Sequence, residues 1–170
     1  MRGGLVYIDR LVRERPTVSG IVSATRGNHG QSLAFAGRAA GVAVTIVVPR
    51  GNSPDKNAAM RGFGAELIEH GDDFQASREH SVRLADQRGL ETVPAFHGDL
   101  CRGVATYAHE LFTSAGELDA VYVPALAGLL ADRAAEPGRV DGRRIGVIVS
   151  GGNIDAPMLA EILAGRTPSP

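Results

Sequence analysis

Residues 23–31, SATRGNHGQ, hold the side chains whose types and spacing point most directly to chemistry. An apolar, β-branched segment (20–22) precedes them, and a small-residue helical pattern follows. At such a strand-to-helix junction the first backbone N–H groups of the helix have no partner and can bind an anion. Gly27 lets the backbone approach a ligand, and Asn28 offers both a donor and an acceptor. The same residues also suit an ordinary turn and helix cap, so spacing alone leaves both interpretations open.

A second candidate site follows the last predicted strand, where Ser150 and Gly151 open the stretch SGGN. Ligands of open α/β sheets bind beyond the carboxyl ends of the strands. A hydroxyl group followed by glycines at this position is therefore suited to contact the edge of a cofactor. The histidines outside residues 23–31 show no metal-ligand spacing with one another or with Cys101, and we predict no metal site.

The elements that must position these residues alternate along the chain. Short apolar segments are separated by helical patterns, which predicts an α/β fold with a mostly parallel sheet. Two helices have start signals: Ser53 and Pro54 open one that ends before Gly64, and Asp72 and Asp73 open another that ends before Gly89. The predicted strands are 20–24, 42–49, 66–69, 91–95, 120–123 and 144–150.

Composition restricts the class of protein. The chain has 170 residues, 44% hydrophobic and 22% charged, with a net charge of −1, and its arginines form no basic block, so we expect no nucleic-acid partner. The longest apolar stretch, 120–131, is too short to cross a membrane, so we expect no membrane partner. No secretory signal is evident and Cys101 is the only cysteine, which favours the cytoplasm.

The chain resembles the threonine dehydratase and serine racemase branch of the fold-type II pyridoxal-phosphate enzymes. The similarity is carried by GIVSATRGNHGQSLAFAGRAAGVAVTIVVPRGNSPDKNAAMRGFGAELIEHG, FHGDLCRGVATYAHELF, DAVYVP and GRRIGVIVSGGNID. It implies a three-layer α/β/α fold like that of the tryptophan synthase β subunit, in truncated form. It also implies pyridoxal 5′-phosphate as cofactor, a small hydroxy amino acid as substrate, and elimination of water to give a 2-oxo acid and ammonia.

The resemblance also implies roles for single residues. The loop formed by Thr25, Arg26, Gly27 and His29 would bind the substrate carboxylate, and Asn28 would bond the 3′-oxygen of the cofactor. Ser150, with Gly151 beside it, would face the pyridine nitrogen. Racemising relatives carry an acid/base serine at the position of Arg26. Because arginine does not give up its proton, this position favours a dehydratase.

The family's catalytic residue is a lysine, and the resemblance places it just before Met1. Lys56 is the only lysine among the 18 residues that are lysine or arginine, and it matches a position outside the catalytic centre. The glycine-rich loop for the cofactor phosphate is also missing after Pro124. We therefore expect no catalytic residue within this chain, weak cofactor binding and no turnover.

The predicted organisation is a small domain (15–112) carrying the asparagine loop, a remnant of the large domain (1–14 with 117–156) and a tail (157–170). Uncovered sheet edges and helix faces on the remnant predict a homodimer or pairing with a full-length relative. Two alternatives remain. One is a non-catalytic module that binds amino acids or regulates a partner. The other is a nucleotide-binding unit, which lacks the expected Gly-x-Gly-x-x-Gly motif.

Overall fold

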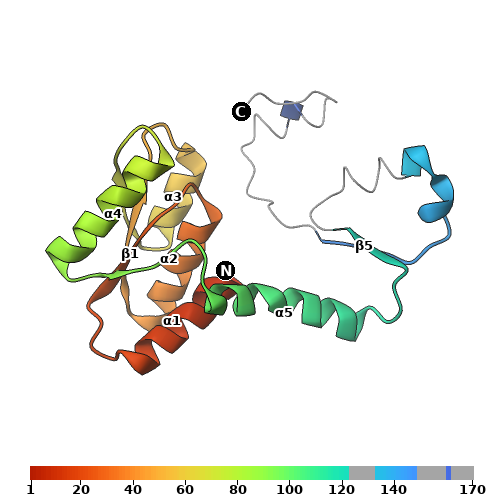
Figure 1. Ribbon diagram of the computed structural model, residues 1–170, viewed down its shortest axis with the longest axis horizontal. Helices are drawn as coiled ribbons and strands as arrows, with labels where there is room; N and C mark the ends of the chain where they lie inside the picture. The colour runs from red at the N-terminus through yellow and green to blue at the C-terminus, as the bar shows by residue number, and fades with distance from the viewer. Residues whose placement is uncertain (123–132, 149–159, 162–170) are drawn as a thin grey trace. The chain divides into compact units, whose positions relative to one another are not determined.

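The computed structural model describes residues 1–122, 133–148 and 160–161. The chain forms two units, residues 1–106 and residues 107–170, each described here by itself (Figure 1). Among the described residues no helix is both long enough and apolar enough to cross a membrane.

The first unit is built on a parallel sheet with strand order β3-β2-β1-β4. The strands are β1 (Gly20–Ala24), β2 (Ala43–Val48), β3 (Glu66–Glu69) and β4 (Glu91–Thr92). Ile21 pairs with Val44 on one side of β1 and with Glu91 on the other. All five residues of β1 are buried, as expected for a central strand that is covered on both faces.

Helices cover both faces of this sheet. The helices are α1 (Arg2–Glu14), α2 (Asn28–Ala40), α3 (Pro54–Gly62), α4 (Phe74–Arg88) and α5 (Gly98–Ser114), of which α5 continues into the second unit. Successive strand residues point to opposite faces, so Ile21 packs with α1 and α2 residues, whereas Val22 packs with Leu84 of α4. This arrangement confirms the predicted three-layer α/β/α fold.

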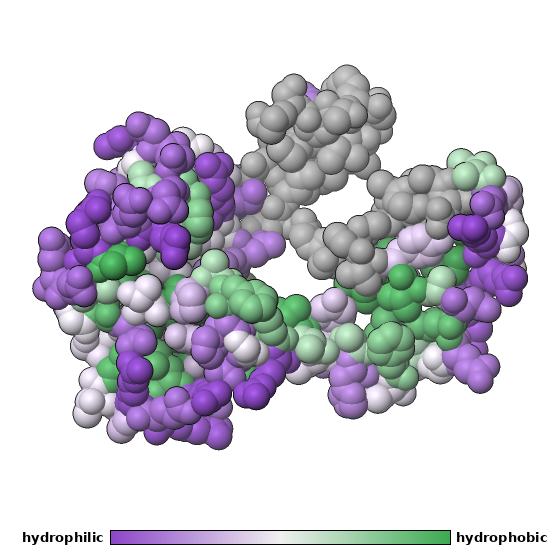
Figure 2. Space-filling model, viewed as in Figure 1, coloured by the Kyte–Doolittle hydropathy of each residue, from purple (hydrophilic) through white to green (hydrophobic). Residues whose placement is uncertain are grey.

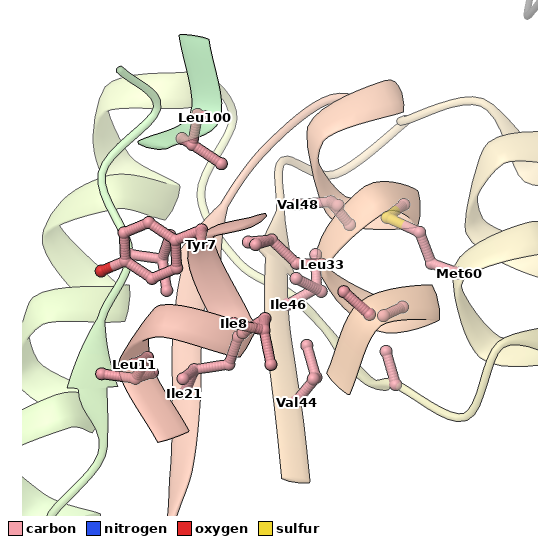
Figure 3. Packing of buried hydrophobic residues seen from close by; sticks show 14 residues of the cluster. Tyr7, Ile8, Leu11, Ile21, Leu33, Val44, Ile46, Val48, Met60 and Leu100 are labelled. Carbon is pink, nitrogen blue, oxygen red and sulfur yellow. The ribbon is translucent and has the colours of Figure 1, made fainter. Parts of the chain in front are cut away.

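The larger part of the core lies between the sheet and helices α1, α2 and α3 (Figure 3). Ile8, Leu33, Ile46 and Met60 are at most 1% exposed there. Gly4 allows α1 to approach α2 closely, because a Cβ at this position would lie 2.5 Å from the Ser32 carbonyl oxygen. The Ser32 hydroxyl accepts the Gly4 N–H and donates to the Met1 carbonyl, which fixes the start of α1 on α2.

The predicted helix boundaries are confirmed by the capping contacts. Ser53 caps α3 by accepting the Lys56 N–H, and Asp73 caps α4 by accepting the Ala76 N–H at 2.8 Å. Gly89 ends α4 in the left-handed conformation, at φ 63°. Strand β4 is shorter than the predicted 91–95, because Pro94 has no N–H to continue the ladder after Val93 donates to Val22.

The structure contains a helix that was not predicted, and its two units differ from the predicted grouping of residues into domains. Helix α1, which no sequence signal predicted, lies in the first unit, whereas we grouped residues 1–14 with 117–156. The described second unit holds the end of α5, a parallel pair of β5 (Ala120–Tyr122) and β6 (Ile145–Val147), and the 3₁₀ turn η1 (Pro137–Arg139). The division into a small domain and a large-domain remnant remains a prediction.

The two units differ at the surface. In the view of Figure 2 the first unit is mostly hydrophilic, whereas hydrophobic residues reach the surface of the second. Phe112, in the part of α5 that belongs to the second unit, is 65% exposed.

Candidate functional site

The loop from Thr25 to Asn28 connects the carboxyl end of β1 to the start of α2. Thr25 continues the strand, since its N–H donates to the Val47 carbonyl at 3.0 Å. Its buried hydroxyl accepts the Gly27 N–H at 3.1 Å. Thr25 therefore shapes the turn, and its side chain is buried in the protein.

The first turn of α2 has no side-chain cap, and its N-cap residue is Gly27. Within the described part of the chain, the backbone N–H groups of His29 and Gly30 have no acceptor. A Cβ at Gly30 would lie 2.5 Å from both the Thr25 methyl carbon and the Met60 sulfur, so the residue must be glycine for α2 to start here. The sequence thus produces an uncapped helix start with two backbone donors available.

His29 is held in one orientation by a residue of β1. The Ser23 hydroxyl has one hydrogen and donates it to the Val93 carbonyl at 2.8 Å. The contact at 3.1 Å between Ser23 Oγ and His29 Nε2 therefore has the histidine as donor, which leaves Nδ1 as an acceptor. Burial lowers the pKa of His29, so the ring is neutral at pH 7.

The other predicted site residues have different surroundings. Asn28 and Arg26 are exposed, and Arg26 has no ion pair or hydrogen bond among the described residues. Ser150 and Gly151 lie outside the described residues, so their predicted role at the pyridine nitrogen is untested. Lys56 lies half-buried in the first turn of α3, next to the Ser53 cap.

Two residues near the loop escaped the sequence analysis. Ser23 was assigned only as part of a strand, although a serine inside an apolar strand is a signal for a buried polar contact. The side-chain nitrogen of Gln31 is buried and has no hydrogen-bond partner in the described structure. It adds an unused donor to the first turns of α2.

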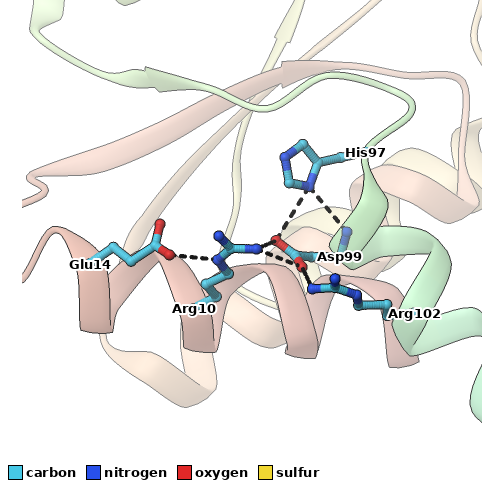
Figure 4. Close-up of polar contacts among 5 residues, drawn as sticks. All are labelled: Arg10, Glu14, His97, Asp99 and Arg102. Carbon is cyan, nitrogen blue, oxygen red and sulfur yellow. Dashed lines mark hydrogen bonds and ion pairs between the residues drawn. The ribbon is translucent and has the colours of Figure 1, made fainter.

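A further polar cluster surrounds Asp99 at the start of α5 (Figure 4). Its carboxylate, only 4% exposed, accepts hydrogen bonds from Arg10 of α1 at 3.2 Å and from Arg102 at 3.0 Å. Arg10 also bonds Glu14, and His97 Nδ1 accepts the Asp99 N–H. These groups bond one another, so the cluster joins α1 to the start of α5. The described residues contain no group of three or more His, Cys, Asp or Glu that could hold a metal ion.

The geometry therefore defines a parallel α/β unit with two unpaired backbone donors, within the described residues, at the carboxyl end of one of its inner strands. The profile of a family described as pyridoxal-phosphate dependent enzymes matches residues 1–132. The chain belongs to this family, and its fold is that of the fold-type II members. The family's cofactor is pyridoxal phosphate.

Individual relatives are similar over most of this chain but over less of their own length. The biosynthetic L-threonine dehydratase of Salmonella typhimurium is 36% identical over 132 residues, 77% of this chain and 26% of that protein. The L-threo-3-hydroxyaspartate ammonia-lyase of Saccharomyces cerevisiae is 31% identical over 144 residues, 81% of this chain and 44% of that protein. A crystal structure of a pyridoxal 5′-phosphate-dependent aspartate racemase superposes with a TM-score of 0.68 and 29% identity, covering 99% of this chain and 52% of the other.

The described residues fit one side of a site for the cofactor and its amino-acid substrate. Within the described residues the N–H groups of His29 and Gly30 have no acceptor, and donors at a helix start suit an anionic ligand. Asn28 is exposed at the same helix start.

Proposed function

We propose that the chain contributes the substrate-carboxylate site of a pyridoxal-phosphate-dependent ammonia-lyase that acts on a small hydroxy amino acid. The observation that supports this most strongly is the pair of unpartnered backbone donors at His29 and Gly30, at an uncapped helix start. A carboxylate bound there gains from both N–H groups and the helix dipole. The dehydratases and ammonia-lyases among the relatives support the reaction class.

Each residue of the loop has a part in this proposal. Thr25 holds the turn, and the neutral His29 ring limits the space beside the bound carboxylate. Asn28 would bond the 3′-oxygen of the cofactor, and Ser150 with Gly151 would lie at the pyridine nitrogen. When bound, the cofactor withdraws electrons from the substrate's α-carbon, which makes loss of the α-proton and of the β-hydroxyl group easier.

Arg26 favours elimination over racemisation. A racemase needs an acid/base group on the second face of the α-carbon, and a guanidinium group does not serve as a proton donor and acceptor in proteins. Arg26 is exposed, and its positive charge adds to the attraction of the loop for an anion.

We further propose that this chain alone does not turn over substrate. The chemistry needs a primary amine at the cofactor, and Lys56 is placed at the cap of α3. The alternative is a non-catalytic module that binds amino acids or regulates a partner. This alternative would be favoured if L-serine binds but no ammonia is released, even when pyridoxal phosphate and a longer chain carrying the lysine are supplied. The cytoplasmic location and the pairing with a second subunit remain predictions.

Calorimetry with L-serine tests the carboxylate site. L-Serine should bind, and L-serinamide, which lacks the carboxylate, should not. Asn28→Asp should raise the free energy of unfolding by about 0.3–1 kcal/mol, because it places a negative charge at a helix start. The same charge should abolish L-serine binding, whereas Asn28→Ala should retain it. Equal binding of L-serine and L-serinamide would refute the proposal.

A further inference from the structure

His97, the residue directly before α5, caps the start of this helix with its ring (Figure 4). Its carbonyl accepts the Cys101 N–H at 3.0 Å, and its Nδ1 accepts the Asp99 N–H at 3.2 Å. The ring therefore satisfies one of the backbone donors that a helix start leaves without a partner. A ring nitrogen that accepts a hydrogen bond carries no hydrogen, so this ring is neutral and has its hydrogen on Nε2.

The same ring nitrogen faces a second partner, the Asp99 carboxylate. Its Oδ2 lies 3.4 Å from His97 Nδ1, and the two dashed lines that leave His97 in Figure 4 mark both contacts. While the ring is neutral, Nδ1 and Oδ2 are both acceptors and no hydrogen lies between them. A proton on Nδ1 reverses this, because the nitrogen can then donate to Oδ2 and can no longer accept the Asp99 N–H.

The surroundings of His97 allow this exchange of partners while α1 stays bonded to Asp99. The His97 ring packs edge-on against Tyr7, with centroids 5.0 Å apart, and the side chain is 43% exposed, so water can deliver a proton. Arg10 Nη1 contacts both Asp99 oxygens at 3.2 Å, and Arg102 bonds Oδ1 at 3.0 Å. Oδ1 can therefore keep both arginines while Oδ2 bonds His97. The other titratable and charged groups in the cavity that His97 lines, of about 190 Å³, are Tyr7, Arg10, Glu14, Arg15, Glu91 and Asp99.

We propose that His97 is a proton-operated cap of α5: the neutral ring holds the Asp99 N–H, and the protonated ring releases it and binds the Asp99 carboxylate instead. Acidification then opens the first turn of α5, because the helix loses its side-chain cap. Since α5 continues into the second unit, the proton acts on the helix that connects the two units along the chain. The inference is independent of the proposed function, because none of these residues belongs to the loop 25–29.

Exchange of the Asp99 amide hydrogen with water tests the inference on the 170-residue chain. The rate is measured at pH 7.5 and pH 5.5, within the range in which histidine side chains change charge, and each rate is divided by that of an unstructured peptide at the same pH. This relative rate should rise about fivefold at pH 5.5, as expected when a helix loses a side-chain cap. The ¹⁵N resonances of the His97 ring should show hydrogen on Nε2 alone at pH 7.5, and increasingly on both nitrogens as the pH falls.

His97→Asn is the matched variant, because an asparagine side-chain oxygen can cap the helix and does not titrate. Its relative exchange rate should be the same at both pH values. His109→Gln, at an exposed position later in α5, is the control and should keep the fivefold change. A wild-type rate that does not change with pH, a fivefold change that persists in His97→Asn, or hydrogen on Nδ1 at pH 7.5 would overturn the inference. The ring resonances need no substitution, so they decide the question even if His97→Asn does not fold.

Discussion

At the scale of single residues, the candidate site depends on how hydrogens are distributed around Ser23. The serine donates to Val93 and accepts from His29, so one side chain connects β1, β4 and the first turn of α2. Because Ser23 is 1% exposed, water cannot replace either contact. The orientation of His29 is therefore fixed before any ligand binds.

Replacing Ser23 with alanine should leave the Val93 carbonyl and the His29 Nε2–H without a partner. We expect the free energy of unfolding to fall by about 1–3 kcal/mol, the cost of unsatisfied buried groups. Urea denaturation measures this change. Ser19→Ala is the matched control: its hydroxyl also donates to a backbone carbonyl, that of Gly89, but it is exposed, so the change should stay within about 0.5 kcal/mol. Equal losses in the two variants would contradict this account of Ser23.

At the scale of elements, the Asp99 cluster joins α1 to the start of α5. Asp99 is buried and accepts from Arg10 of α1 and from Arg102 of its own helix. Surface ion pairs such as Asp9 with Arg13, on α1, contribute far less, because both partners are solvated.

Asp99→Asn should therefore lower the free energy of unfolding by about 1.5–3 kcal/mol, because the buried carboxylate loses charge-assisted hydrogen bonds to two arginines that are themselves partly exposed. Asp9→Asn, the solvated control, should change it by less than about 0.5 kcal/mol. Thermal and urea denaturation of both variants give the comparison. A loss in Asp99→Asn as small as the control's would show that the cluster does not hold α1 and α5 together.

The elements also show how far the sequence could predict this structure. Helices α3 and α4 were predictable because Ser53, Asp73 and Gly89 are strong local signals at helix ends. Strands β1 and β3 match the predicted ranges 20–24 and 66–69. Helices α1 and α5 were missed, since glycines such as Gly3 and Gly103 weaken a helical pattern. These glycines are required because Gly103 meets the backbone of Arg2, a contact that only the tertiary structure reveals.

The candidate site, too, was predictable only where its residues lie close together in the sequence. The loop 25–29 could be recognised because its residues are contiguous in the sequence. The direction of the hydrogen bond between Ser23 and His29 could not, because it depends on the contact of Ser23 with the Val93 carbonyl, 70 residues further along the chain.

At the scale of the whole molecule, two histidines make stability depend on pH. Burial lowers the pKa of His29, and burial together with the charges of His70, Arg83 and Arg88 lowers that of His80. The rings of His70 and His80 are stacked, with centroids 3.8 Å apart. Protonation is therefore easier in the unfolded chain than in the folded one.

The free energy of unfolding should be constant near pH 7.5 and fall as the pH drops below the ordinary histidine value of about 6.5. Urea denaturation at pH 7.5 and pH 5.5 measures the decrease. His80→Gln should make the decrease smaller, whereas His109→Gln, at an exposed position of α5, should leave it unchanged. A decrease that is the same in all three proteins would contradict the role of His80.

The central claim is that the start of α2 binds the carboxylate of an amino acid through backbone N–H groups. Its most direct test follows the amide resonances of the 170-residue chain during titration with L-serine. We predict saturable shifts at His29 and Gly30. The start of α4, which Asp73 already caps, serves as the control and should change little. Unchanged His29 and Gly30 resonances at saturating L-serine, or shifts of the same size with L-serinamide, would contradict the claim.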